Sequence, residues 1–144
     1  MKFWDSSAVV PLLVPQESSA RMAKRYQADP IVNVWCLTAV EAWSAICRLR
    51  REGLLDSPAM RVARRRLQGL AASWIEVDDL GAVRVRAQRL LETHALRAGD
   101  SLQLAAALVL VSDRPERIGF VSLDARLAEA AEREGFDIEG VTPA

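Results

Sequence analysis

The chain has 144 residues, 51% of them hydrophobic, and its 19 basic and 19 acidic residues give a formal net charge of zero. This length and composition suit a single domain over residues 1–144 that buries a core of its own. Zero net charge does not by itself indicate nucleic-acid binding, and no apolar run reaches the roughly 20 residues that a membrane span requires.

The first half of the chain predicts two strands, each followed by a pair of helices. Residues 2–4 predict a short strand, and a helix follows from Ser6 or Ser7, interrupted or bounded by Pro11 and Pro15. The next elements are expected as a helix over 18–27, a turn at Asp29-Pro30, a buried strand over 31–35 and helices over 38–52 and 57–73. The last two helices, separated near Gly53, look like an antiparallel arm.

The second half repeats the alternation of strand and helix. A strand is expected at 74–77, followed by a helix from Asp78 or Asp79 to about His94. Gly99-Asp100 opens the most apolar helix, which continues over 102–111. The remaining elements are expected as a loop at 113–116, a strand at 118–122, a helix at 125–134 and a last strand at 136–138.

This alternation predicts an α/β fold. Strands separated by helices form a parallel sheet with helices on its faces, and all-apolar strands fit a sheet that is covered on both sides. We therefore expect a three-layer α/β/α sandwich with a central parallel sheet and a helical arm. The N-terminus is no signal peptide, because Asp5 interrupts it at once, so we expect a cytoplasmic protein with no membrane partner. The cysteines, Cys36 and Cys47, form no metal-ligand pattern and are expected as buried free thiols.

Four acidic residues lie where an apolar segment gives way to a helix: Asp5, Glu41, Asp100 and Asp124. In open α/β folds ligands collect outside the carboxyl ends of the strands, so acids from distant parts of the sequence can meet in one crevice. Clustered carboxylates raise each other's pKa, and a divalent cation such as Mg²⁺ relieves that conflict. The pattern therefore predicts a metal-dependent phosphoryl-transfer site.

Helix capping is the alternative explanation for each acid alone. Asp is a favoured N-cap, and Thr38-x-x-Glu41 matches a capping box. The apolar neighbours of all four acids predict partial burial, and buried carboxylates are rarely left unpaired. For the set as a whole, metal coordination is the simpler hypothesis.

The residues around these acids resemble the four motifs of PIN domains. The similar segments are Asp5-Ser6-Ser7-Ala8-Val9-Val10, Leu37-Thr38-Ala39-Val40-Glu41, Leu96 to Ala105 around Asp100, and Phe120 to Leu127 around Asp124. Their order, their spacing and the chain length look like a VapC-type toxin, the ribonuclease half of a bacterial toxin–antitoxin pair. Gln103 is a departure, because many members have His there.

The resemblance implies a PIN-like fold and a Mg²⁺- or Mn²⁺-dependent endoribonuclease that cleaves phosphodiesters with metal-activated water. By motif, Asp5, Glu41, Asp100 and Asp124 would be catalytic, and all but Glu41 would bind the metal. The hydroxyls of Ser6 and Ser122 would support the acids. The resemblance also implies a VapB-like antitoxin as partner and a homodimer.

RNA requires cationic contacts, and arginines follow the acids in the sequence. Arg48 lies about two turns after Glu41 on the same expected helix, and Arg126 lies half a turn after Asp124. We expect both to contact RNA phosphates, as Lys and Arg do in nucleic-acid complexes. His94 and the tryptophans are expected to be structural, since no Ser-His-Asp or Cys-His pairing is visible.

Two rival functions stay open on the sequence alone. One is another PIN-like metal-dependent nuclease or phosphatase outside a toxin–antitoxin pair. A haloacid-dehalogenase-like phosphatase would need a second Asp two residues after Asp5, where Ser7 stands. The other rival is a non-catalytic PIN-like binding module, for which no metal binding is expected.

Overall fold

The computed structural model of the protein describes residues 1–141, so the last three residues of the expected domain, 142–144, lie outside the described residues. Five parallel strands form one sheet in the order β3-β2-β1-β4-β5. The strands are β1 Lys2–Trp4, β2 Val32–Trp35, β3 Ile75–Val77, β4 Gly119–Val121 and β5 Asp137–Glu139. The predicted α/β fold with a central parallel sheet is confirmed.

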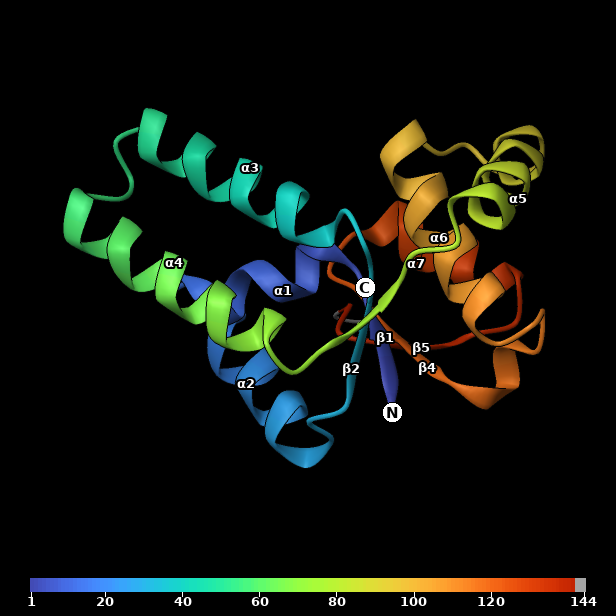
Figure 1. Ribbon diagram of the computed structural model, residues 1–144, viewed down its shortest axis with the longest axis horizontal. Helices are drawn as coiled ribbons and strands as arrows, with labels where there is room; N and C mark the ends of the chain where they lie inside the picture. The colour runs from blue at the N-terminus through green and yellow to red at the C-terminus, as the bar shows by residue number, and fades with distance from the viewer. Residues whose placement is uncertain (142–144) are drawn as a thin grey trace.

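Helices cover both faces of this sheet, which gives the three layers expected (Figure 1). One layer contains α1 Ser6–Leu13, α2 Ser19–Ala28, α3 Thr38–Arg51 and α4 Ser57–Ala71. The opposite layer contains α5 Leu80–Thr93, α6 Ala98–Leu110 and α7 Ala125–Arg133. Within residues 1–141, no helix is both long and apolar enough to cross a bilayer.

Side chains alternate between two hydrophobic cores, because successive residues of a strand point to opposite faces. Phe3 packs into the core under α5 to α7, and its neighbour Trp4 packs into the core under α1 to α4. Both are fully buried. Burial of large side chains of this kind contributes roughly 1.5–3 kcal/mol each. The strands, although short, are therefore held from both sides.

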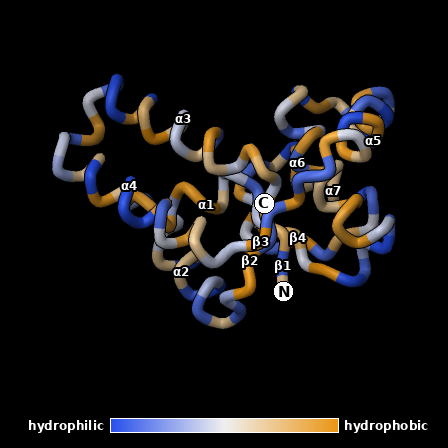
Figure 2. The backbone as a smooth tube through the Cα atoms, in the orientation of Figure 1, coloured by the Kyte–Doolittle hydropathy of each residue, from blue (hydrophilic) through white to orange (hydrophobic). Residues whose placement is uncertain are grey.

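The arm is formed by α3 and α4, which run side by side away from the sheet (Figure 1). Gly53 allows the turn between them with a positive φ of 76°, and the Asp56 carboxylate caps α4 by accepting from the Ala59 amide at 2.8 Å. The guanidinium of Arg64 on α4 lies 4.4 Å from the ring centroid of Trp43 on α3. Hydrophilic residues are prominent towards the tip of the arm (Figure 2).

Four local predictions were wrong. Pro11 does not interrupt α1, which continues through it to Leu13 and ends before Pro15. Proline removes one helical hydrogen bond, and the buried packing of α1 outweighs that loss. The helix α6 begins at Ala98, two residues before Asp100, and the loop expected at 113–116 includes the start of a 3₁₀ turn, Pro115–Arg117. Cys36 and Cys47 are free thiols, but they are only partly buried.

Candidate active site

The candidate site lies at the point in the sheet where the order of adding strands reverses. From β1 the chain adds β2 and β3 on one side, and then returns to add β4 and β5 on the other side. Asp5 follows β1 and Asp124 comes shortly after β4, so both lie at the carboxyl ends of adjacent central strands. The Asp5 amide donates to the Val121 carbonyl at 3.1 Å, which continues the pairing of these strands. Ligands of open α/β sheets bind at such switch points.

All four acids of the predicted set line one pocket with a volume of about 440 Å³. They come from the ends of β1 and β4 and from the first turns of α3 and α6. The complete lining is Asp5, Ser6, Ser7, Val10, Val40, Glu41, Ser44, Ala45, Arg48, Asp100 and Asp124. The fold therefore brings together carboxylates separated by up to 119 residues in the sequence.

Asp5 is the most buried of the acids, with 3% of its surface exposed. Burial raises the pKa of its carboxyl to about 7, and the negative charge of Asp124 adds to that rise. The Ser7 hydroxyl opposes the rise, because it donates to Asp5 Oδ1 at 2.7 Å. A carboxyl in this environment carries a proton for part of the time at neutral pH.

Glu41 is held by hydroxyl and amide groups from two other elements. The hydroxyl of Ser6 donates to Glu41 Oε2 at 3.2 Å. Burial raises the pKa of Glu41, hydrogen bonds from Gln103 and Ser6 lower it, and the charge of Asp100 raises it. The amide of Gln103 in turn donates to Thr38 Oγ1 at 3.1 Å, and both of these side chains are buried. A buried polar contact thus joins the start of α3 to the second turn of α6.

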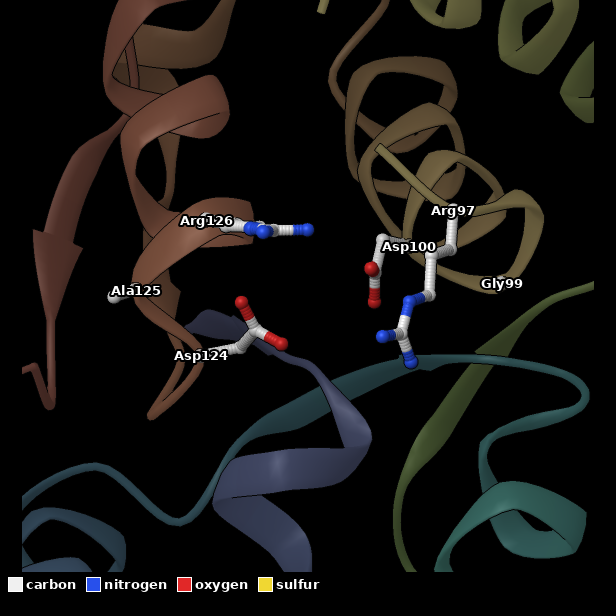
Figure 3. Close-up of a pocket in the computed structure, with 6 residues that line it drawn as sticks. All are labelled: Arg97, Gly99, Asp100, Asp124, Ala125 and Arg126. Atoms are coloured by element: carbon white, nitrogen blue, oxygen red, sulfur yellow. The ribbon is translucent and has the colours of Figure 1, made fainter. Parts of the chain in front are cut away.

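Asp100 and Asp124 face each other across an adjoining pocket of about 570 Å³ (Figure 3). Arg97 and Arg126 extend their side chains towards the same space (Figure 3). Burial and the charge of Asp124 raise the pKa of Asp100, while the charges of Arg97 and Arg126 lower it. The two pockets share Asp100 and Asp124, so they form one continuous crevice.

Capping explains only one of the four acids. Asp124 caps α7, with its Oδ1 accepting from the Leu127 amide at 3.0 Å. Asp5 occupies the N-cap position of α1 but makes no side-chain capping bond, and Asp100 lies inside the first turn of α6. The capping box considered as the alternative for Thr38 and Glu41 does not form, because Leu37 is the N-cap and Thr38 bonds Gln103 instead. Capping therefore leaves three of these carboxylates unexplained.

The chemistry of the donors fits a divalent cation, since carboxylate and hydroxyl oxygens are the ligands that Mg²⁺ prefers. As the side chains stand, however, no three Asp, Glu, His or Cys residues among residues 1–141 are arranged to hold a metal ion. The four acids share a pocket without forming such a three-ligand group. The motif resemblance implies Asp5, Asp100 and Asp124 as the ligands.

The supporting residues lie beside the acids. Ser122 is buried, and its hydroxyl accepts from the Asp124 amide at 3.1 Å. Arg48 lines the acidic pocket and Arg126 lines the adjoining one. The sequence did not identify Ser7 as a site residue, although its position two residues after Asp5 places it close enough to contact that acid. It also missed Arg97, which lies one helical turn before Asp100.

His94 and the tryptophans lie apart from the acids or beneath them. His94 is the C-cap of α5, and its Nε2 lies 3.7 Å from the Glu134 carboxylate. Trp4, Trp35 and Trp74 are buried in the cores. None of the four residues lines either pocket. These placements agree with structural roles.

Comparison of the chain with models of known protein families, and with curated proteins, finds no match.

Proposed function

We propose that the protein is a metal-dependent endoribonuclease, and that it acts as the toxin of a VapC-type toxin–antitoxin pair in the cytoplasm. The observation that supports the activity is the pocket shared by Asp5, Glu41, Asp100 and Asp124 at the carboxyl end of the sheet. The motif resemblance around the same four acids supports the particular class of enzyme.

The residues of the pocket suit hydrolysis of a phosphodiester without a nucleophilic side chain. A bound divalent cation would supply charge stabilisation and a more acidic water. Asp5, Asp100 and Asp124 would hold the cation. Glu41, whose pKa is raised by burial, could accept a proton from the attacking water. Arg48 would bind a phosphate beside the acids, because its guanidinium carries a fixed positive charge.

RNA as the substrate is supported by the charge of the arm. Residues 38–71 contain seven arginines and three acids, whereas the whole chain has no net charge. One arginine of this arm, Arg48 on α3, lines the acidic pocket. A cationic surface beside a cation-binding centre suits a polyanionic substrate.

Cleavage of a mixed RNA substrate tests the activity. We expect cleavage with Mg²⁺ or Mn²⁺, none in excess EDTA, and loss of cleavage in Asp5→Asn and Asp100→Asn variants that remain folded. Single-stranded DNA and a small aryl phosphate in the same panel test the rival nuclease or phosphatase. Faster hydrolysis of either than of RNA, or full activity of both variants, would contradict the proposal.

A non-catalytic binding module is the second candidate, favoured by the absence of a preformed three-ligand group among residues 1–141. It predicts no heat of Mn²⁺ binding in calorimetric titration, whereas the nuclease predicts saturable binding that Asp100→Asn weakens. This titration requires no knowledge of the RNA target.

The toxin role makes predictions in cells and in solution. Expression of the chain alone should arrest growth of its host, and co-expression of the adjacent VapB-like antitoxin should relieve the arrest. We also propose a homodimer, to be measured by sedimentation equilibrium. Unimpaired growth during expression of a catalytically active protein would contradict the toxin role while leaving the nuclease activity intact.

A further inference from the structure

The crevice does not end at the acids but continues along α7. The pocket beside Asp100 and Asp124 shares Arg126 with a third pocket of about 280 Å³. The third pocket is lined by His94, Ala95, Leu96, Arg126, Glu129, Ala130 and Arg133. Arg126 and Arg133 are seven residues apart, so they lie on the same face of α7, roughly 10 Å apart along its axis.

The arginines nearest the acids are available to a ligand. Arg97 and Arg126 are exposed, and within residues 1–141 neither forms an ion pair with a carboxylate closer than 4 Å. Further along α7, Arg133 pairs with Glu129 at 2.6 Å on the exposed surface. Ion pairs on the surface contribute little to stability, so Arg133 can exchange its carboxylate partner for a phosphate.

We propose that Arg97, Arg126 and Arg133 form a phosphate-binding track for single-stranded RNA on the α7 side of the scissile phosphate. The inference rests on the proposed ribonuclease function and deepens it. Arg48 lies across the acids from this track, so RNA would be held on both sides of the reacting phosphate. The length of α7 between Arg126 and Arg133 corresponds to about three stacked nucleotides.

The alternation of charge along the crevice favours a nucleic acid over an acidic peptide. The track places Arg97 and Arg126 immediately beside Asp100 and Asp124, and Arg133 roughly 10 Å further along α7. An RNA strand presents its phosphates at regular spacing and can place one of them at the acids and the next ones at Arg97 and Arg126.

Binding of a short fluorescein-labelled oligouridylate in EDTA tests the track without cleavage. Anisotropy titrations over about 50 to 200 mM salt give the slope of log K against log salt, which changes by about 0.7 for each lost phosphate contact on a single strand. We expect Arg97→Ala, Arg126→Ala and Arg133→Ala each to reduce the slope by about that amount and to weaken binding roughly threefold to tenfold. The matched control is Arg117→Ala, because Arg117 is exposed and precedes β4 at the opposite end of the sheet.

The outcomes separate the track from the nuclease activity. Smaller slopes for the three variants and an unchanged slope for Arg117→Ala would support the track, even if the protein cleaved no RNA. Slopes that all match the wild type would overturn it, even if RNA were cleaved. Tighter binding of labelled oligoglutamate than of oligouridylate, sensitive to the same variants, would also overturn it and indicate an acidic peptide as the ligand.

Discussion

The hydroxyl of Ser7 donates to the carboxylate of Asp5 at 2.7 Å, and the same oxygen accepts from the Leu123 amide at 2.9 Å. One side chain thus connects the turn after β1 with the turn after β4. These turns carry Asp5 and Asp124, so Ser7 fixes the relative position of two acids of the candidate site.

Replacing Ser7 with alanine should destabilise the protein by about 1–3 kcal/mol, because the Leu123 amide loses its partner in a partly buried turn. Loss of the donor should also raise the pKa of Asp5 further. Urea denaturation measures the change in stability. Ser44→Ala is the control, since Ser44 lines the same pocket but is exposed. Equal stability of the two variants would show that the Ser7 contacts contribute nothing.

Asp5→Asn should stabilise the fold in a pH-dependent manner. The folded-state pKa of Asp5, about 7, exceeds the value of 3.8 for an exposed aspartate, so the folded state binds this proton more tightly than the unfolded state. The stability of the wild type therefore falls as pH rises from about 4 to about 7. In Asp5→Asn the side-chain amide does not titrate, so this loss of stability does not occur. At about pH 8 the gain should be roughly 4 kcal/mol, and it should shrink towards zero at about pH 4.

Thermal unfolding of Asp5→Asn and wild type across this pH range measures the effect. The control is Asp79→Asn, because Asp79 caps the exposed start of α5 by accepting from the Ala82 amide at 3.1 Å, and asparagine caps equally well. A lower melting temperature for Asp5→Asn than for wild type at about pH 8 would refute the argument from burial.

The fold was predictable because its signals are local, whereas the contacts that shape the site are not. The period of apolar residues predicted every strand and α-helix of residues 1–141 to within a few residues, and Asp124 was a recognisable cap. No local pattern, however, could show that Thr38 would bond Gln103 across 65 residues rather than close a capping box with Glu41. That choice depends on the start of α3 and the start of α6 meeting at the carboxyl end of the sheet, which only the tertiary structure determines.

The pair formed by Gln103 and Thr38 should behave as a coupled unit. Gln103→Leu leaves the buried Thr38 hydroxyl without its partner, and Thr38→Val does the same to the Gln103 amide. Each change should cost about 1–3 kcal/mol, and the double variant should cost less than the sum by roughly 0.5–3 kcal/mol. Urea denaturation of all four proteins closes the double-mutant cycle, and strict additivity would mean that the bond is not made.

Gln103→Leu should also affect the site through Glu41. A hydrogen bond from Gln103 lowers the pKa of Glu41, so its removal should move the ascending limb of the pH–rate profile for RNA cleavage to higher pH. Thr38→Val, which leaves the Gln103 amide in place, is the matched comparison. A loss of stability without any movement of the profile would restrict Gln103 to a structural role.

Metal binding should release a proton from Asp5. A cation requires the carboxylate, and the Asp5 pKa of about 7 means that most molecules are protonated below that pH. Affinity for Mn²⁺ should therefore rise by up to about tenfold per pH unit below about pH 7 and level off above it. Calorimetry in two buffers of different ionisation enthalpy should find release of close to one proton at about pH 6 and little at about pH 8. In Asp5→Asn this release should disappear along with most of the affinity. Binding of Mn²⁺ with a constant affinity across this range would show that the cation avoids Asp5, and would move the metal centre towards Asp100 and Asp124 alone.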